Sequence, residues 1–180
     1  MSELMMSNER KGGDFEIHPE GTFMAVCRDI WIERKPNDKY PGTNQWGNPE
    51  PEQLVKVCID FLTDDPIEIN GEMMPRFMRF KANQSWGDKS SLRDFVTRWN
   101  PAVGRAEKAD LETLVGTGAY LTISHSEPKD GKVWANITSV APPPKGASIP
   151  KIPSGFVRHK DKAAEPQQPA PQRDEHGVPF

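Results

Sequence analysis

The sequence predicts an all-β, mainly antiparallel OB-fold barrel with one or two short helices between its third and fourth strands. Two observations predict this fold. Five separate stretches have the patterns of strands, the first apolar on parts of both faces and the later ones with a period of two, and the period changes to that of a helix between the third and fourth of them. The domain is expected over residues 15–142, after a flexible N-terminal arm at 1–14 and before a disordered C-terminal tail.

The first three strands are separated by two breaks in the pattern. Residues 21–34 are apolar on parts of both faces, as expected for a strand that bends around a barrel. Pro and Gly recur through 36–52, which predicts a long loop. The second and third strands are expected over 54–62 and 75–82. The Asn70-Gly71 dipeptide between them is a hairpin-turn signal, because both positions tolerate positive φ.

The helical part and the closing hairpin follow. In residues 89–99 the apolar side chains recur at i, i+3, i+4 and i+7, which forms one face of an amphipathic helix. A second short helix is expected over 106–116, before a Gly that ends it. The last two strands, 119–127 and 133–140, flank an Asp130-Gly131 turn and complete the barrel.

Composition and charge limit the function classes. Residues 1–140 carry 17 basic and 22 acidic side chains, whereas residues 141–180 carry 6 and 4. Because the domain is acidic overall, nucleic-acid binding would need a polarised surface. The two cysteines form neither a disulfide framework nor a CxxC pair, and no apolar run is long enough to span a membrane. We therefore expect a cytoplasmic protein that does not associate with a membrane and that binds no metal or cofactor.

The C-terminal region divides into a linker and a tip. Residues 143–173 are rich in Pro, Gln and charge, so they bury too little apolar surface to order and are expected to be a disordered linker. Residues 174–180 place two acids ahead of a terminal Val-Pro-Phe. A terminal Phe can fill an apolar pocket while its carboxylate pairs with a cation, so this end is either a tethered peptide ligand or an unstructured terminus.

This end resembles the C-terminal tip of bacterial single-stranded DNA-binding proteins, in which an acidic run closed by Ile-Pro-Phe follows an OB-fold and a disordered linker. The resemblance implies that the tip recruits replication, recombination and repair proteins. The matching positions are Asp174, Glu175, Pro179 and Phe180, with Val178 in place of the family's isoleucine. His176 and Gly177 interrupt the acidic run, so this tip is less acidic than the family's.

A second resemblance covers about residues 21–146. The stretches KSSLRDFVTRW and DLETLVGTGAYLTISHSEPKDGKVWANITSVAPPPKG are similar to small phage-encoded OB-fold proteins. Members of that family are usually regarded as single-stranded DNA-binding or replication-associated. The resemblance implies a phage protein that acts in the cytoplasm of a bacterial host.

The candidate binding surface follows from the fold. OB-folds bind oligonucleotides across strands two and three and the loops that join strands 1–2 and 4–5. Single strands need cations along the backbone and aromatic rings on which bases stack. The residues of these types in those places are Arg34, Lys35, Lys39, Tyr40, Trp46, Lys56, Arg76, Phe77, Arg79, Lys81, Trp86, Lys132 and Trp134. Packing against the barrel is the alternative for each aromatic ring, and Trp31 and Trp99 are assigned to the core.

These features predict a protein that coats single-stranded DNA in phage replication or recombination, self-associates, recruits partners through its tip and catalyses no reaction. One alternative is an OB-fold interaction module of the replisome or of host takeover that binds no DNA, which the acidic domain favours. The other is a metal-dependent nuclease that uses clustered carboxylates. Those carboxylates are Asp60, Asp64, Asp65 and Glu68.

Overall fold

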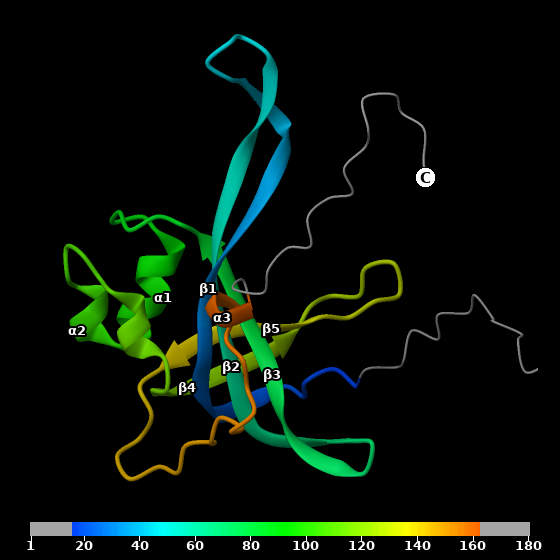
Figure 1. Ribbon diagram of the computed structural model, residues 1–180. Helices are drawn as coiled ribbons and strands as arrows, with labels where there is room; N and C mark the ends of the chain where they lie inside the picture. Colours follow the sequence, from blue (N-terminus) through cyan, green and yellow to red (C-terminus); the bar gives the residue numbers. More distant parts are fainter. Residues whose placement is uncertain (1–15, 163–180) are drawn as a thin grey trace, which may run out of the picture.

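The computed structural model describes residues 16–162 and contains one five-stranded sheet (Figure 1). The strand order is β3-β2-β1-β4-β5, and every neighbouring pair is antiparallel. The strands are β1 (Gly21–Thr43), β2 (Pro49–Ile69), β3 (Glu72–Asn83), β4 (Gly118–His125) and β5 (Ala135–Ala141). The helices are α1 (Ser91–Trp99), α2 (Pro101–Gly104), η1 (Leu111–Leu114) and α3 (His159–Lys162). The antiparallel sheet and the presence of short helices between β3 and β4 are confirmed. The helix expected over 106–116 is reduced to the 3-10 turn Leu111–Leu114, and α2 was not expected.

The core lies between the sheet and α1. The ring of Phe61 on β2 meets the indole of Trp99 edge to face at 5.2 Å, and Phe80 on β3 stacks on Phe95 at 3.8 Å. The Trp99 Nε1–H donates to the Gly118 carbonyl at 2.8 Å, which satisfies the one polar group that this buried ring carries. The apolar face predicted for 89–99 is therefore the face that packs on the sheet, and the prediction of this helix is confirmed.

The prediction of a long loop over 36–52 is wrong. Beyond the body of the sheet, β1 and β2 continue as a two-stranded arm that projects from the domain (Figure 1). The Asn44 side chain closes its turn by accepting hydrogen bonds from the backbone N–H groups of Trp46 and Asn48, both at 3.0 Å. Each strand of a two-stranded arm has one unpaired edge, where a proline loses no ladder hydrogen bond. Proline-rich sequence is thus compatible with strand here.

Both predicted hairpin turns are confirmed. Asn70 and Gly71 have φ of 52° and 82°, and Asp130 and Gly131 have φ of 52° and 71°. Such left-handed pairs match the twist of the strands they join. Between β3 and β5, the two ends of the sheet, the described residues form no ladder, so the observed architecture is an antiparallel sheet with its two edge strands unpaired.

The first part of the predicted linker packs on the domain. Within residues 143–162, the Ile149 side chain lies against Gly118, and Arg158 forms an ion pair with the buried Asp29 at 2.8 Å. Composition misses this because a few specific ion pairs, rather than a high apolar content, hold the segment. The predicted arm at 1–14, the linker from residue 163 and the tip at 174–180 lie outside the described residues. None of the helices described in 16–162 is long and apolar enough to cross a membrane.

Candidate nucleic-acid interface

A groove of about 890 Å³ lies between β3 and the start of β5. Phe77, Arg79 and Lys81 line it from β3, and Trp134 lines it from the segment just before β5. Phe77 is 39% exposed and Trp134 is 61% exposed, so both rings present apolar surface to solvent. The structure therefore brings together four of the residues that the sequence singled out, two cations and two aromatic rings.

A buried carboxylate fixes the cation in the middle of this surface. Asp60 on β2 is fully buried, and its Oδ1 and Oδ2 accept hydrogen bonds from Arg79 Nε at 2.6 Å and from the second guanidinium nitrogen at 3.0 Å. The hydrogen bond to Asp60 raises the pKa of Arg79. The guanidinium lies over the Trp31 ring at 4.9 Å and over the Phe77 ring at 5.0 Å. Arg79 is thus held between two aromatic platforms.

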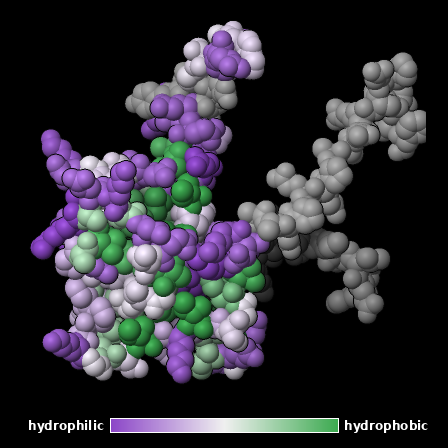
Figure 2. All heavy atoms as spheres, turned by 60° about the vertical axis from the view of Figure 1, so that its left-hand side comes forward, coloured by the Kyte–Doolittle hydropathy of each residue, from purple (hydrophilic) through white to green (hydrophobic). Residues whose placement is uncertain are grey.

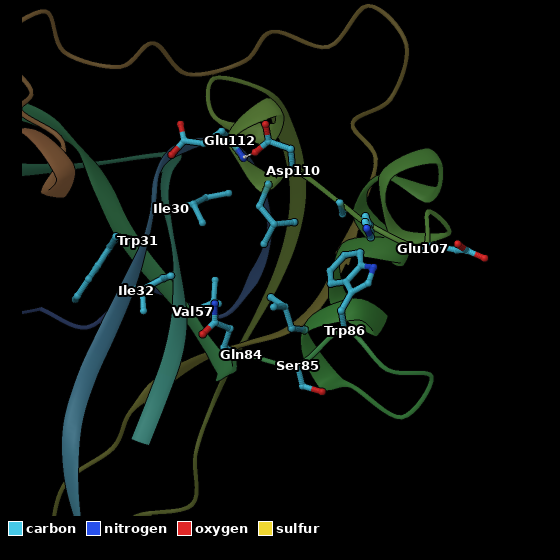
Figure 3. Close-up of a pocket in the computed structure, with 14 residues that line it drawn as sticks. Ile30, Trp31, Ile32, Val57, Gln84, Ser85, Trp86, Glu107, Asp110 and Glu112 are labelled. Atoms are coloured by element: carbon cyan, nitrogen blue, oxygen red, sulfur yellow. Dashed lines mark hydrogen bonds between the residues drawn. The ribbon is translucent and has the colours of Figure 1, made fainter. Parts of the chain in front are cut away.

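The assignment of Trp31 to the core is wrong. Trp31 is half-buried, and its Nε1–H donates to Asp60 Oδ2 at 3.1 Å on the outer face of the sheet. Figure 3 shows the indole on the opposite side of β1 from Ile30 and Ile32. Both faces of 21–34 are partly apolar, so periodicity could not decide which one faces the core. The contact with Asp60 and Arg79 is the signal that identifies Trp31, and it is not local in sequence.

Three further predicted cations are in ion pairs, and one of them, Lys35, lies 3.3 Å from the same Glu33 carboxylate that Lys81 contacts. The Lys81 ammonium lies 3.1 Å from both carboxylate oxygens of Glu33. This hydrogen bond from Lys81 is the main reason why the pKa of Glu33 is lowered. Arg76 is buried, with Nε 2.6 Å from Asp65 and another nitrogen 3.3 Å from Glu16. The outer surface therefore includes Lys81 but not Arg76, whose guanidinium is committed to the domain.

The remaining predicted residues lie away from the groove. The projecting arm carries Arg34, Lys35, Lys39, Tyr40 and Trp46. Trp46 is 76% exposed at the turn of the arm, and the side chain of Tyr40 lies outside the described part of the structure. Lys132 is exposed in the β4–β5 loop, and Lys56 is half-buried on β2 opposite Glu33. The arm therefore places these cations and Trp46 away from the groove, and acids such as Glu33 and Glu52 are interspersed among them.

Trp86 lines a different cavity of about 620 Å³ between the base of the arm and the helices (Figure 3). Its Nε1–H donates to the Ala106 carbonyl at 2.9 Å, and the opposite wall is formed by Ile30 and Ile32. Glu107, Asp110 and Glu112 also line the cavity. Figure 2 shows this side of the molecule, with apolar groups gathered between hydrophilic ones below the arm. Trp86 lines this cavity and not the groove, so it does not extend the groove.

The carboxylates of the nuclease alternative are dispersed. Asp60 is engaged by Arg79 and Trp31, and Asp65 by Arg76. Within residues 16–162, no three His, Cys, Asp or Glu side chains are arranged to hold a metal ion. The sequence cluster of acids therefore does not become a spatial cluster in the part of the chain that the structure describes.

Comparison of the chain with models of known protein families gave no match, and comparison with curated proteins gave none. The function must therefore be argued from the groove itself. Its distinguishing property is that Phe77, Arg79 and Lys81 on β3 face Trp134 across it, while the Arg79 guanidinium also lies over the Trp31 ring on β1.

Proposed function

We propose that this chain is an OB-fold protein that binds single-stranded DNA in the groove between β3 and β5. The strand order supports the fold, because β1 lies between β2 and β4 and the edge strands β3 and β5 are the pair that closes an OB barrel. The observation that carries the function is the surface of Trp31, Arg79 and Phe77, in which a guanidinium lies against two aromatic rings.

Bases stack on the exposed ring of Trp134 and on the part of Phe77 that Arg79 and Arg28 leave exposed, and such stacking contributes about 1–3 kcal/mol per base. Phosphates approach Lys81, whose side chain is 37% exposed, and compete with Glu33 for its ammonium. Arg79 keeps its bond to Asp60 and its place between the Trp31 and Phe77 rings, so it acts by fixing the position of these two rings. Because every ring accepts any base, this binding is tolerant of sequence and weakens as salt rises.

The biological setting of the proposal is phage replication or recombination. The protein coats the strand, self-associates along it, and recruits replication and recombination proteins through Asp174, Glu175 and the terminal Val178–Phe180. One OB domain covers only about 4–16 nucleotides, so coating requires many copies. The projecting arm, with Trp46 exposed at its turn, offers a surface for a neighbouring copy or for the strand beyond the groove.

A protein-interaction module without DNA binding is the second candidate. The pairing of Arg79 with Asp60 and of Lys81 with Glu33 favours it, because these ion pairs reduce the positive potential of the face. Under this alternative the groove accepts an apolar peptide, and affinity for DNA is absent at every salt concentration.

A fluorescence titration separates the two candidates. The tryptophan emission of the full chain is followed as oligo-dT of about 35 nucleotides is added, with duplex of the same length as control, at two salt concentrations. Quenching by the single strand alone, weakened by salt, is the expected result. No quenching and no change in anisotropy of a labelled strand would overturn DNA binding and leave the interaction module.

A further inference from the structure

The residues that end the described chain cross the outer face of β1. In Figure 1, α3 lies against β1 beside the sheet. Arg158 anchors this segment, since its Nε lies 2.8 Å from Asp29 Oδ1 and its two terminal nitrogens lie 2.8 and 2.9 Å from the Glu112 carboxylate. Asp29 is fully buried beneath it. The segment therefore covers part of the surface that also carries Trp31.

The side chain of His159 is placed as a nucleobase would be. Its imidazole lies flat on the Trp31 indole, with 3.9 Å between ring centroids and 7° between the planes. Its Nδ1 lies 3.0 Å from Asp29 Oδ2, which also accepts the backbone N–H of His159 at 2.8 Å. A planar nitrogen heterocycle is thus stacked on one side and bonded at its edge to a carboxylate.

A carboxylate at the edge of a stacking platform selects among bases. Asp accepts a hydrogen bond from the exocyclic amine of cytosine, whereas thymine presents a carbonyl oxygen at the corresponding position. Carboxylate and carbonyl oxygens repel each other. The pair of Trp31 and Asp29 therefore favours a base with an amino group over thymine, whose only donor is N3–H.

A nucleotide bound here brings a negatively charged phosphate, and Arg28 is a cation that can meet it. The Arg28 guanidinium lies over the rings of Phe77 at 4.7 Å and of Phe156 at 4.4 Å. Its Nε is buried without a hydrogen-bond partner, and within residues 16–162 the guanidinium forms no ion pair. Arg79, Lys81 and Arg158 are each paired with carboxylates. Arg28 is thus a cation next to the site formed by Trp31 and Asp29, and no direct partner neutralises it.

We infer that Trp31 and Asp29 form a further subsite for an amino-bearing base, which the imidazole of His159 occupies until a single strand replaces it. The inference rests on the proposed function. Only the His159 side chain must swing out, since Arg158 and the His159 backbone keep their bonds to Asp29. Arg28 then meets the phosphate next to that base.

The test uses the full chain and two substitutions in the same segment. His159→Ala removes the imidazole from Trp31, and Val157→Ala changes a neighbouring side chain that is 49% exposed. Affinities for labelled oligo-dC and oligo-dT are measured by anisotropy. Because one base–aromatic stack is gained, His159→Ala should tighten binding of oligo-dC by about tenfold and that of oligo-dT much less, while Val157→Ala changes neither. Adding Trp31→Leu to the His159→Ala variant should remove the gain in affinity for oligo-dC.

The outcomes separate this inference from the function on which it rests. If the unmodified chain binds single strands but His159→Ala leaves affinity unchanged or lowers it, the subsite is overturned and the groove stands. An equal gain for oligo-dC and oligo-dT would overturn the role of Asp29. If no variant binds either strand, the proposed function itself fails. As a second measurement, Arg28→Gln should reduce the salt slope of binding by about 0.7, the value for one phosphate contact on a single strand.

Discussion

Asp60 and Arg79 lie directly opposite each other on β2 and β3, and their side chains form a two-point ion pair at 2.6 and 3.0 Å. The Trp31 indole donates to the same carboxylate, so one buried acid positions both a cation and an aromatic ring on the outer face. Removing the acid would release both. This relationship makes the proposed interface a rigid surface, which reduces the entropy cost of ordering side chains when a ligand binds.

Asp60→Asn should destabilise the domain and loosen the interface together. The substitution leaves Arg79 without its charged partner, and breaking a paired charge that is mostly buried costs about 2 kcal/mol after allowance for the partial exposure of Arg79. Urea unfolding measures this loss. The matched control is Asp94→Asn, because Asp94 and Arg98 form an exposed pair on α1, for which a change below about 0.5 kcal/mol is expected. Equal effects of the two substitutions would contradict the structural role of Asp60.

Phe77→Ala and Lys81→Ala should each weaken binding of single-stranded DNA, for different reasons. Loss of the ring removes one stack and costs about 1–3 kcal/mol at any salt concentration. Loss of the ammonium should instead lower the salt slope by about 0.7. Lys89→Ala, an exposed cation just before α1, is the control. Anisotropy at several salt concentrations measures both quantities, and an unchanged affinity for Phe77→Ala would exclude the groove as the binding surface.

Gly104→Ala should destabilise the domain without any direct effect on the groove. A Cβ at Gly104 would overlap the backbone of Thr97, which cannot move without shifting α1. Overpacking of this kind costs about 1–3 kcal/mol. At Gly87 a Cβ would meet nothing within 4 Å, so Gly87→Ala serves as the control and should change the free energy of unfolding little. Thermal unfolding of the two variants should therefore differ clearly.

The contacts of Arg158 and His159 with Asp29 on β1 should make the free energy of unfolding depend on pH. Burial alone would raise the pKa of Asp29, but hydrogen bonds from the His159 backbone, from Arg158 and from the His159 side chain outweigh it and lower the pKa below 3.8. A carboxyl whose pKa is lower in the folded state stabilises the fold above its unfolded pKa and loses that contribution as pH falls through the folded value. Unfolding free energy should therefore decrease below about pH 4. Asp29→Asn should flatten this decrease, and an identical pH profile would show that the contacts contribute nothing.

The C-terminal tip can be tested separately from the groove. Deleting Val178–Phe180 should leave affinity for single-stranded DNA unchanged or slightly tighter, because the groove residues are far from it in sequence. The same deletion should abolish capture of replication and recombination proteins from host extract by the immobilised protein. Capture that survives the deletion would remove the proposed recruiting role of the tip.

The elements of the fold that depend on near neighbours were predictable. Period-two stretches became strands, the helical period became α1, and Asn70-Gly71 and Asp130-Gly131 adopted the left-handed turns that they favour. The arm was missed because proline content was taken as a sign of a loop. On a two-stranded arm each strand keeps one free edge, where proline is tolerated.

The candidate site was predictable on β3 and at Trp134. Phe77, Arg79 and Lys81 share a face because alternate residues of any strand do. Whether each cation is free or paired was not predictable, because Glu33 and Asp60 belong to other strands. The same reason explains the burial of Arg76, whose partners Glu16 and Asp65 come from two other segments.

The amino-acid sequence by itself determined the strands, the turns and the amphipathic helix, since these follow from interactions within a few residues. Only the tertiary structure decided that Trp31 faces outward, that Asp60 is buried and that Arg158 lies on Asp29. Arg158 and Asp29 are 129 positions apart in the sequence. Such contacts depend on how strands and tail are brought together in space, and a charged or aromatic side chain carries no local mark of the partner that it will meet.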